Sequence, residues 1–273
     1  MPFAHFFKKK DNNLSYYAWF SAMHSRADFL FTGGESEAQL NELTERAVQL
    51  IADIEATANC YNEQSELSKL VRTAVKAPTH VSTMLYELLM KGKAYHAMTS
   101  GFYDITFAST PHDAQTIDDI VLGEPDEVSL ARTGVYINMC GMLKGYALDK
   151  IGELVRSYSI ENALLSFGNS SIMAIGHREG CDGWPIRLPQ AAQSNELTLH
   201  DECLSTSGND SNDRKHIVNP LTGRLIEGRN TLSLITHDAA LGDALSTACF
   251  ACSTSQAKAI AQKAVARIIE SNS

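Results

Sequence analysis

Apolar residues recur every three or four positions after Ser36 and again after Ser82, which predicts two amphipathic helices. The first begins with Ser36 and Gln39 in the positions of a capping box and continues to about residue 54. The second is predicted to end at Gly101, because glycine commonly terminates helices. The same spacing predicts helices after Cys140 and near residues 239–252 and 256–269.

Runs of aromatic and β-branched residues predict strands between these helices. The strands are expected at 15–23, 27–31, 135–139, 163–167 and 172–175, with shorter ones at 184–188, 197–200 and 231–236. The polar stretch 110–130 contains Pro111, Gly123 and Pro125 and predicts a loop. Strand hairpins mixed with long helices favour an α+β fold, and the length favours a single domain over 1–273 or two closely packed subdomains.

Composition narrows the function class. The 273 residues are 44% hydrophobic, which is ample for a core, and the net charge is −9. A negative chain disfavours nucleic acid as a partner, because phosphate backbones require a basic surface. No apolar run approaches the roughly 20 residues of a membrane span.

The first ten residues place Lys8, Lys9 and Lys10 after an apolar stretch, the reverse of a secretory signal. A cytoplasmic location is therefore expected, or a periplasmic or membrane-surface location if a leader precedes this sequence. The six cysteines are scattered, so a disulfide framework is not indicated. Cys249 and Cys252 have metal-ligand spacing but lie in an apolar helical segment, which favours core cysteines.

Two polar segments suggest chemistry. A strand that turns into a helix near Gly141 would present backbone N–H groups and Lys144 to a phosphate, although an ordinary turn with a solvated lysine has the same pattern. Asp243 and Thr247 lie one helical turn apart and, with a backbone carbonyl, would form an all-oxygen site suited to Mg²⁺. The alternative is a helix cap and a surface hydroxyl.

Taken in order, seven segments resemble motifs of the ApbE family, the FAD:protein FMN transferases. They are Met23-His24-Ser25, Tyr61 with Ser65-Glu66-Leu67-Ser68, Gly101-Phe102-Tyr103-Asp104, Asn138 to Ala147, Thr206-Ser207-Gly208, His216 to Gly223 and Gly242 to Thr247. The resemblance covers nearly the whole chain and implies a T-fold-like architecture, in which antiparallel or mixed sheets pack with long helices.

The resemblance also implies an activity, protein flavinylation. Family members bind FAD and, with Mg²⁺, move its FMN moiety onto a Ser or Thr hydroxyl of an acceptor redox protein, releasing AMP. By position, the residues implied to bind the flavin nucleotide are Met23, Tyr61, Phe102, Tyr103, Asp104, Cys140, Lys144 and Val218. The implied Mg²⁺ ligands are the Leu143 carbonyl, Asp243 and Thr247, with Ser246 as an additional ligand. His216 and Asp243 are the two candidates for the catalytic base.

Several motif positions depart from the family. Asn138 and Asn219 replace aspartates, Cys140 replaces a glycine and His24 replaces a glycine. The asparagines remove charge but keep hydrogen-bonding capacity. Two alternatives to the transferase therefore stay open: a pyrophosphatase that cuts FAD into FMN and AMP, and a relative that binds FAD without turnover.

Overall fold

A computed structural model describes residues 2–10, 13–33, 36–188, 196–209, 217–227 and 231–269. Its helices and antiparallel sheets confirm the α+β prediction. The α-helices in these ranges are α1 (Glu37–Ala58), α2 (Glu66–Thr73), α3 (Thr83–Met98), α4 (Cys140–Ser157), α5 (Ala239–Ala251) and α6 (Thr254–Lys263). None of them is both long and apolar enough to cross a bilayer.

One large antiparallel sheet organises the molecule. Its spatial order is β1 (Ala4–Lys10), β2 (Asn13–Ala22), β3 (Ser25–Thr32), β7 (Asn162–Phe167), β8 (Ser171–Ile175), β11 (Cys203–Gly208), β14 (Thr231–Thr236) and β15 (Arg267–Ile269). Smaller sheets pair β9 (Trp184–Arg187) with β10 (Glu196–Leu199), and β12 (Val218–Asn219) with β13 (Arg224–Leu225). A third joins β4 (Thr79–His80), β6 (Glu127–Leu130) and β5 (Ile120–Gly123), next to the short 3₁₀ helix η1 (Thr116–Asp119).

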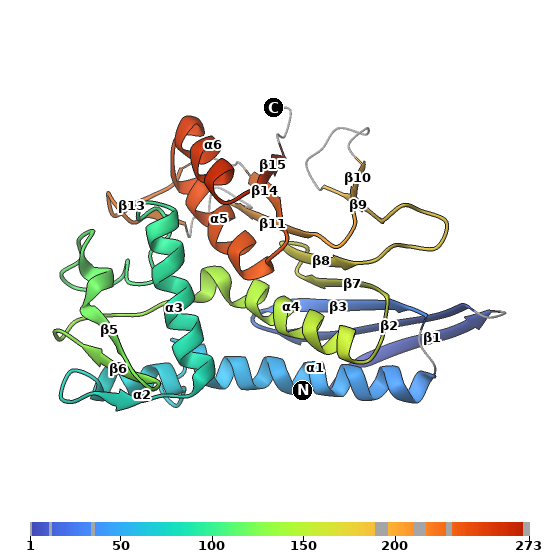
Figure 1. Cartoon of the computed structure of the whole chain (residues 1–273), viewed down its shortest axis with the longest axis horizontal. Coiled ribbons are helices and arrows are strands. Elements are labelled where there is room, and N and C mark those ends of the chain that lie inside the picture. The colour runs from blue at the N-terminus through green and yellow to red at the C-terminus, as the bar shows by residue number, and fades with distance from the viewer. Residues whose placement is uncertain are drawn as a thin grey trace.

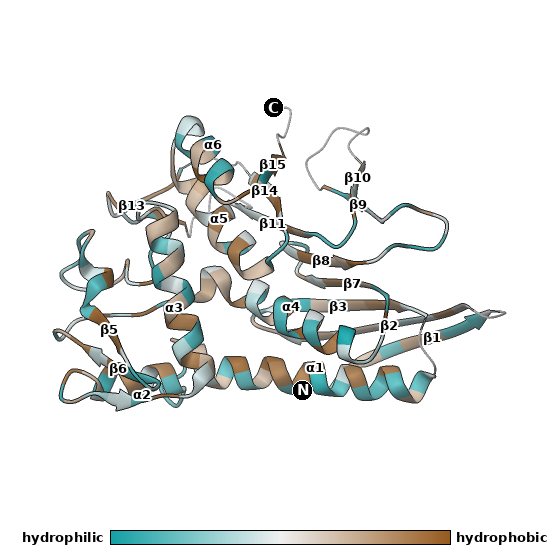
Figure 2. Cartoon of the chain, viewed as in Figure 1, coloured by the Kyte–Doolittle hydropathy of each residue, from teal (hydrophilic) through white to brown (hydrophobic). Residues whose placement is uncertain are grey.

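The two faces of the large sheet bury different cores. Side chains alternate along each strand, so Phe29 and Met173 face the main core, where α1, α4 and α5 pack (Figure 1). Ile172 and Leu204 point the other way and pack with Trp184 of the β9–β10 hairpin. Figure 2 shows hydrophobic and hydrophilic residues alternating along α1, as the sequence predicted for an amphipathic helix.

The helix starts were predictable from their caps. The Ser36 and Ser82 side chains accept hydrogen bonds from the backbone N–H groups of Gln39 and Leu85, three residues further on. In α4, the cap residue Met139 contributes no side-chain bond, but the Asn138 side chain accepts the Cys140 N–H at 2.9 Å. The start of α4 is therefore fixed by the asparagine that replaces the family aspartate.

Three sequence predictions of secondary structure were wrong. Residues 110–130 contain η1, β5 and β6, not only loop. Residues 135–139 form no strand, because the Asn138 N–H donates to the Ile105 carbonyl and the Tyr136 N–H to the Ser109 hydroxyl, so the segment joins no sheet. The last predicted helix stops at Lys263, and residues 267–269 form the edge strand β15.

Candidate functional site

A buried carboxylate stands at the junction of α4, α5 and the large sheet. Ser171 of β8 and Ser205 of β11 are direct cross-strand partners and share the face that α5 covers. Their hydroxyls both donate to Asp243 Oδ1 at 2.8 Å. The Gly145 N–H of α4 donates to Asp243 Oδ2, also at 2.8 Å. Two strands and one helix therefore hold this side chain in place.

The surroundings of Asp243 set its charge. Its exposed fraction is only 6%, and burial raises the pKa of its carboxyl above the ordinary value. The positive charge of Lys144 and the three hydrogen bonds act in the opposite direction and favour the carboxylate.

Hydroxyl groups surround the backbone of Asp243. Ser246 Oγ and Thr247 Oγ1 donate to its carbonyl at 3.0 and 3.1 Å. Ser207 Oγ of β11 lies 2.7 Å from Ser246 Oγ and 3.2 Å from Thr247 Oγ1. Thr206, one position earlier, points to the opposite face and bonds to Ser233. This separation follows from the two-residue repeat of a strand.

Tyr103 lies beside this cluster with an unsatisfied hydroxyl. Its oxygen is buried and has no hydrogen-bond partner. A side chain on Gly141 would meet the Tyr103 ring at 3.1 Å and Thr247 Oγ1 at 3.7 Å, so the start of α4, Tyr103 and Thr247 are neighbours. An unpartnered buried hydroxyl costs about 1–3 kcal/mol, so this group points to a ligand that would supply the missing bond.

A small pocket opens between the end of α1 and the start of α4. We call it the slot; its lining is Met23, His24, Glu55, Asn59, Tyr61, Cys140, Leu143 and Lys144. Tyr61 is 69% exposed, so the slot lies at the surface. Its volume of about 80 Å³ is below the roughly 300–1,000 Å³ of most small-molecule sites. The slot is therefore one part of any nucleotide site.

The β2–β3 turn supplies one edge of the slot. Met23 and His24 both have left-handed backbones, with φ of +49° and +55°, in the two-residue turn that joins these strands. The Met23 N–H donates to Glu55 Oε1 at 3.2 Å, which ties the turn to α1. Two consecutive residues with positive φ are typical of a type I′ hairpin, where glycine or asparagine is preferred. Backbone strain of this kind often accompanies a functional site.

Lys144 brings positive charge to the opposite edge. Its Nζ donates to Ser170 Oγ at 2.5 Å, and it lies in the second turn of α4. The N-terminus of a helix carries partial positive charge and favours anions such as phosphate. The start of α4 therefore offers a phosphate both a helix terminus and an ammonium group.

The family resemblance implies a bound Mg²⁺ ion. The oxygen atoms around Asp243 are the kind of ligand that Mg²⁺ prefers. Among the described residues, no three His, Cys, Asp or Glu side chains are arranged to hold a metal, so a cation would depend on Asp243 and neutral oxygens. Mg²⁺ is typically bound by one or two carboxylates together with substrate phosphates. The unpartnered Tyr103 hydroxyl leaves polar capacity for such a group.

Four further predicted residues have other surroundings or lie beyond the described ranges. Phe102 is buried in the main core. Asp104 accepts hydrogen bonds from the N–H and hydroxyl of Thr106 at 2.7 and 2.6 Å and contacts His112 Nε2 at 2.8 Å. These contacts occupy Asp104 as a brace for its loop. Val218 lies in β12, whose Asn219 is bonded to Ala251 at the far end of α5. His216 lies outside the described residues.

Sequence reasoning missed the serines that hold Asp243. Ser170 and Ser171 carry no motif of their own, and Ser205 stands just before the Thr206-Ser207-Gly208 motif without an implied role. Ser171 could have been suspected because it occupies an inward position in an otherwise apolar strand, in phase with Met173 and Ile175. Its partner could not be identified without the register of β8 on β11.

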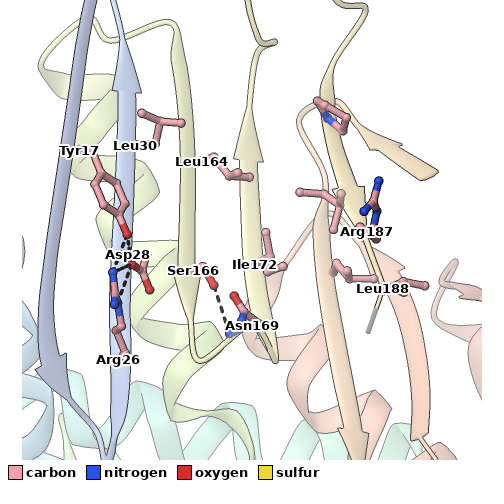
Figure 3. A pocket seen from close by; sticks show the side chains of 13 residues that line it. Tyr17, Arg26, Asp28, Leu30, Leu164, Ser166, Asn169, Ile172, Arg187 and Leu188 are labelled. Carbon is pink, nitrogen blue, oxygen red and sulfur yellow. Dashed lines mark hydrogen bonds and ion pairs between the residues drawn. The ribbon is translucent and has the colours of Figure 1, made fainter. Parts of the chain in front are cut away.

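A second hollow of about 590 Å³ lies on the other face of the large sheet (Figure 3). Arg26, Asp28 and Tyr17 form a hydrogen-bonded group at one side, with Arg26 Nε donating to Asp28 at 2.8 Å. Leu30, Leu164 and Ile172 form an apolar floor. Although it is larger than the slot, none of the predicted site residues lines it. We therefore take the slot and the Asp243 cluster, not this hollow, as the candidate functional site.

Comparison with known proteins identifies the family of this chain. A family model described as the ApbE family matches residues 23–269, and the chain belongs to that family. A relative named FAD:protein FMN transferase from Chlamydia trachomatis is 26% identical over 228 residues, 71% of each chain. Another with that name, from Haemophilus influenzae, is 22% identical over 271 residues, 84% of this chain and 78% of the relative.

Solved structures confirm the fold. The flavin transferase ApbE of Vibrio cholerae superposes with a TM-score of 0.78 at 18% identity, covering 98% of this chain and 93% of that one. The apo flavinyl transferase ApbE of Pseudomonas stutzeri gives a TM-score of 0.79 at 16% identity, covering 91% and 88%. The resemblance drawn from seven short motifs is confirmed.

Proposed function

We propose that this protein is an FAD:protein FMN transferase. It takes FAD as substrate, uses Mg²⁺ and attaches FMN to a Ser or Thr hydroxyl of an acceptor redox protein, releasing AMP. The observation that carries the proposal is the direct contact between α4 and Asp243, which sets Lys144 and the helix start next to a buried carboxylate. The shared name of the relatives supports the same activity.

The reaction exchanges a phosphoanhydride bond of the pyrophosphate for a phosphate ester bond to the acceptor. The acceptor hydroxyl oxygen bonds to the phosphorus of the FMN half, and the bond from that phosphorus to the bridging oxygen breaks. AMP leaves with the bridging oxygen, and a base takes the hydroxyl proton. Such reactions depend mostly on positioning and charge stabilisation, which Lys144 and the start of α4 provide for the pyrophosphate.

Mg²⁺, when bound, would neutralise phosphate oxygens and assist departure of AMP. The proposed ligands are the Asp243 carboxylate, the Thr247 and Ser246 hydroxyls and the Leu143 carbonyl. Because hydrogen bonds hold the Asp243 carboxylate in a fixed place, with Ser246 and Thr247 on the same helix, we assign it to the cation. His216 is then the proposed base for the acceptor hydroxyl.

A protein acceptor needs an open site. The 69% exposure of Tyr61 leaves one wall of the slot facing solvent, so a flavin stacked there would remain reachable from outside. A second substrate as large as a protein can approach only such a surface site. This feature is the reason for preferring transfer to a protein over hydrolysis in a closed cavity.

The decisive experiment incubates the full chain with FAD and Mg²⁺, with and without an acceptor domain from a family target, and separates the products by chromatography. We expect AMP only with the acceptor, whose mass rises by one FMN. AMP and free FMN without the acceptor would instead establish the hydrolase. Intact FAD that co-elutes with the protein would establish a binding protein without turnover.

A further inference from the structure

The second hollow, on the outer face of the large sheet, has a continuous apolar floor. Tyr17, Leu30 and Leu164 are direct cross-strand partners on β2, β3 and β7, so their side chains form one row on the face opposite to the main core. Ile172 and Leu204, partners on β8 and β11, extend this floor. The volume of about 590 Å³ lies within the roughly 300–1,000 Å³ that binding sites commonly have.

One wall of the hollow is the edge of a strand. Pro185, Ile186 and Arg187 are consecutive residues of β9, and all three line the hollow. Successive side chains of a strand point to opposite faces, so a strand whose neighbouring residues all reach one cavity turns its edge toward that cavity. The other edge of β9 pairs with β10, and within the described residues no further strand pairs with β9. Such an edge suits an extended polypeptide that adds as another strand.

The opposite wall carries a guanidinium group. Arg26 Nε donates to Asp28 at 2.8 Å, and its Nη2 donates to the Tyr17 hydroxyl at 2.7 Å, so the side chain is held in place although it is exposed. Figure 3 shows Arg187 on the far side of the apolar floor from this group. The lining thus contains two arginines and one aspartate, in a chain whose net charge is −9. A partner with a carboxylate beside apolar side chains complements such a lining.

The hollow reaches the end of the sheet at which the proposed phosphate site lies. The β7–β8 turn contains Asn169, which lines the hollow, and Ser170, which accepts the bond from Lys144 Nζ at 2.5 Å. Gly168 of the same turn lies so close to Ser25 that a Cβ on it would be 2.2 Å from the serine Oγ. Ser25 directly follows the β2–β3 turn that forms one edge of the slot. A single turn therefore separates the hollow from the residues proposed to bind the pyrophosphate.

We propose that the hollow binds an extended segment of the acceptor protein, next to the hydroxyl that receives FMN. The segment pairs with the edge of β9, places apolar side chains on Leu30 and Leu164, and presents a carboxylate to Arg26. The hydroxyl then reaches past the β7–β8 turn to the start of α4. This inference rests on the proposed function for the identity of the partner, but docking itself makes and breaks no covalent bond and can be measured without FAD.

The test uses the full chain and the acceptor domain of the transfer assay. Calorimetric titration without FAD gives the Kd of the acceptor, and transfer rates with saturating FAD and Mg²⁺ give its KM. Arg26→Gln removes a charge from the wall, and Leu164→Asp places a carboxylate on the apolar floor. For both variants we expect the Kd and the KM of the acceptor to rise by about tenfold or more, with kcat and FAD affinity unchanged. Acceptor binding to the parent should slow hydrogen exchange of the backbone in residues 184–188.

Arg46→Gln is the matched control. Arg46 is also exposed, pairs with Glu42 at 2.9 Å and lies 5.5 Å from the ring centre of Tyr158, much as Arg26 lies 5.9 Å from that of Trp19. It belongs to α1 and does not line the hollow, so this variant should bind the acceptor like the parent. If urea unfolding shows that Leu164→Asp does not fold, the exposed position of Arg26 decides the test.

The outcomes separate docking from catalysis. Parent values of Kd and KM in Arg26→Gln and Leu164→Asp would overturn docking in the hollow and leave the proposed function intact. Acceptor binding that Arg26→Gln weakens, without FMN transfer by the parent, would support docking and overturn the transferase. A dimer of the acceptor-free chain that Arg26→Gln dissociates in sedimentation would assign the hollow to a second copy of this chain and overturn the proposal.

Discussion

The Gly145 N–H and the Asp243 carboxylate meet at 2.8 Å, although 98 positions separate them in the sequence. This bond connects the helix that starts at the slot with the helix that carries the proposed cation ligands. The residues proposed for phosphate and for Mg²⁺ are therefore held in one rigid relationship.

Gly145→Ala should separate α4 from α5. A Cβ at this position would lie 2.1 Å from the Ala239 carbonyl oxygen, so the helices must move apart. Overpacking of this kind costs about 1–3 kcal/mol, and urea unfolding should show a loss in that range. The matched control is Gly123→Ala, whose Cβ would have its nearest neighbour at 3.5 Å. Equal stability of the two variants would contradict the close approach.

Asp243→Asn should separate activity from stability. The variant loses the proposed cation ligand, so we expect FMN transfer to fall by about 100-fold or more. Burial raises the pKa of this carboxyl, which means that its charge is costly in the fold, and a neutral amide removes that cost. Thermal unfolding at pH 7 should change little. Transfer within tenfold of the parent rate would contradict the assignment.

Tyr103→Phe should stabilise the ligand-free protein. The hydroxyl is buried without a partner, and its removal should recover part of the roughly 1–3 kcal/mol that such a group costs. The rise in Tm caused by FAD and Mg²⁺ should become smaller, because the ligand loses a bond. Tyr146→Phe is the control: its hydroxyl donates to Glu87 at 3.0 Å, so that variant should be destabilised. A lower Tm for ligand-free Tyr103→Phe would refute the interpretation.

Lys144→Met should raise the pH below which the rate of FMN transfer falls. The charge of Lys144 lowers the pKa of Asp243, so its removal raises that pKa further. The ionised carboxylate is the form that binds a cation, and a more alkaline medium is then needed to produce it. Rates measured across pH should show this shift in addition to weaker FAD binding. Lys69→Met, at an exposed position on α2, should leave the profile unchanged.

Asp149 should make stability depend on pH. It accepts the Ala239 and Ala240 N–H groups at the start of α5, yet burial and the nearby Asp238 raise its pKa to about 7. Between about pH 4 and 7 the folded state holds more protons than the unfolded chain, so this group makes stability fall as pH rises. The free energy of unfolding, measured in urea, should fall less between pH 5 and pH 7 for Asp149→Asn than for the parent protein. Parallel pH curves would contradict the raised pKa.

Much of the fold could be predicted from periodicity and caps. The helices after Ser36 and Ser82 have clear apolar stripes and serine caps, and both form. The errors came from segments whose partners are distant. Val135, Ile137 and Met139 alternate as in a strand and are buried, but no neighbouring strand receives their backbone groups. Alternation predicts which side chains are buried. It does not predict whether a neighbouring strand is present to accept the backbone hydrogen bonds.

The candidate site was predictable only where a motif marked it. Asp243, Thr247 and Lys144 were marked first by their spacing in predicted helices and then by the family resemblance, and the structure places Asp243 in contact with the helix that carries Lys144. Ser171 and Ser205 could not be found, because their relationship to Asp243 depends on strand register. The predicted nucleotide contact of Asp104 stays a prediction, and its bonds to Thr106 and His112 depend on a loop conformation that spacing does not specify.

The pairing of β3 with β7 also affects when the site can form during synthesis. It joins residues 25–32 to 162–167, and the chain between them contains α1 to α4. Closing so long a loop is entropically costly, and non-local pairing is slow. The residues that line the slot precede α5 in the chain. Asp243 is therefore synthesised after both walls of the slot. FAD capture during refolding should therefore lag behind helix formation and report completion of the native structure.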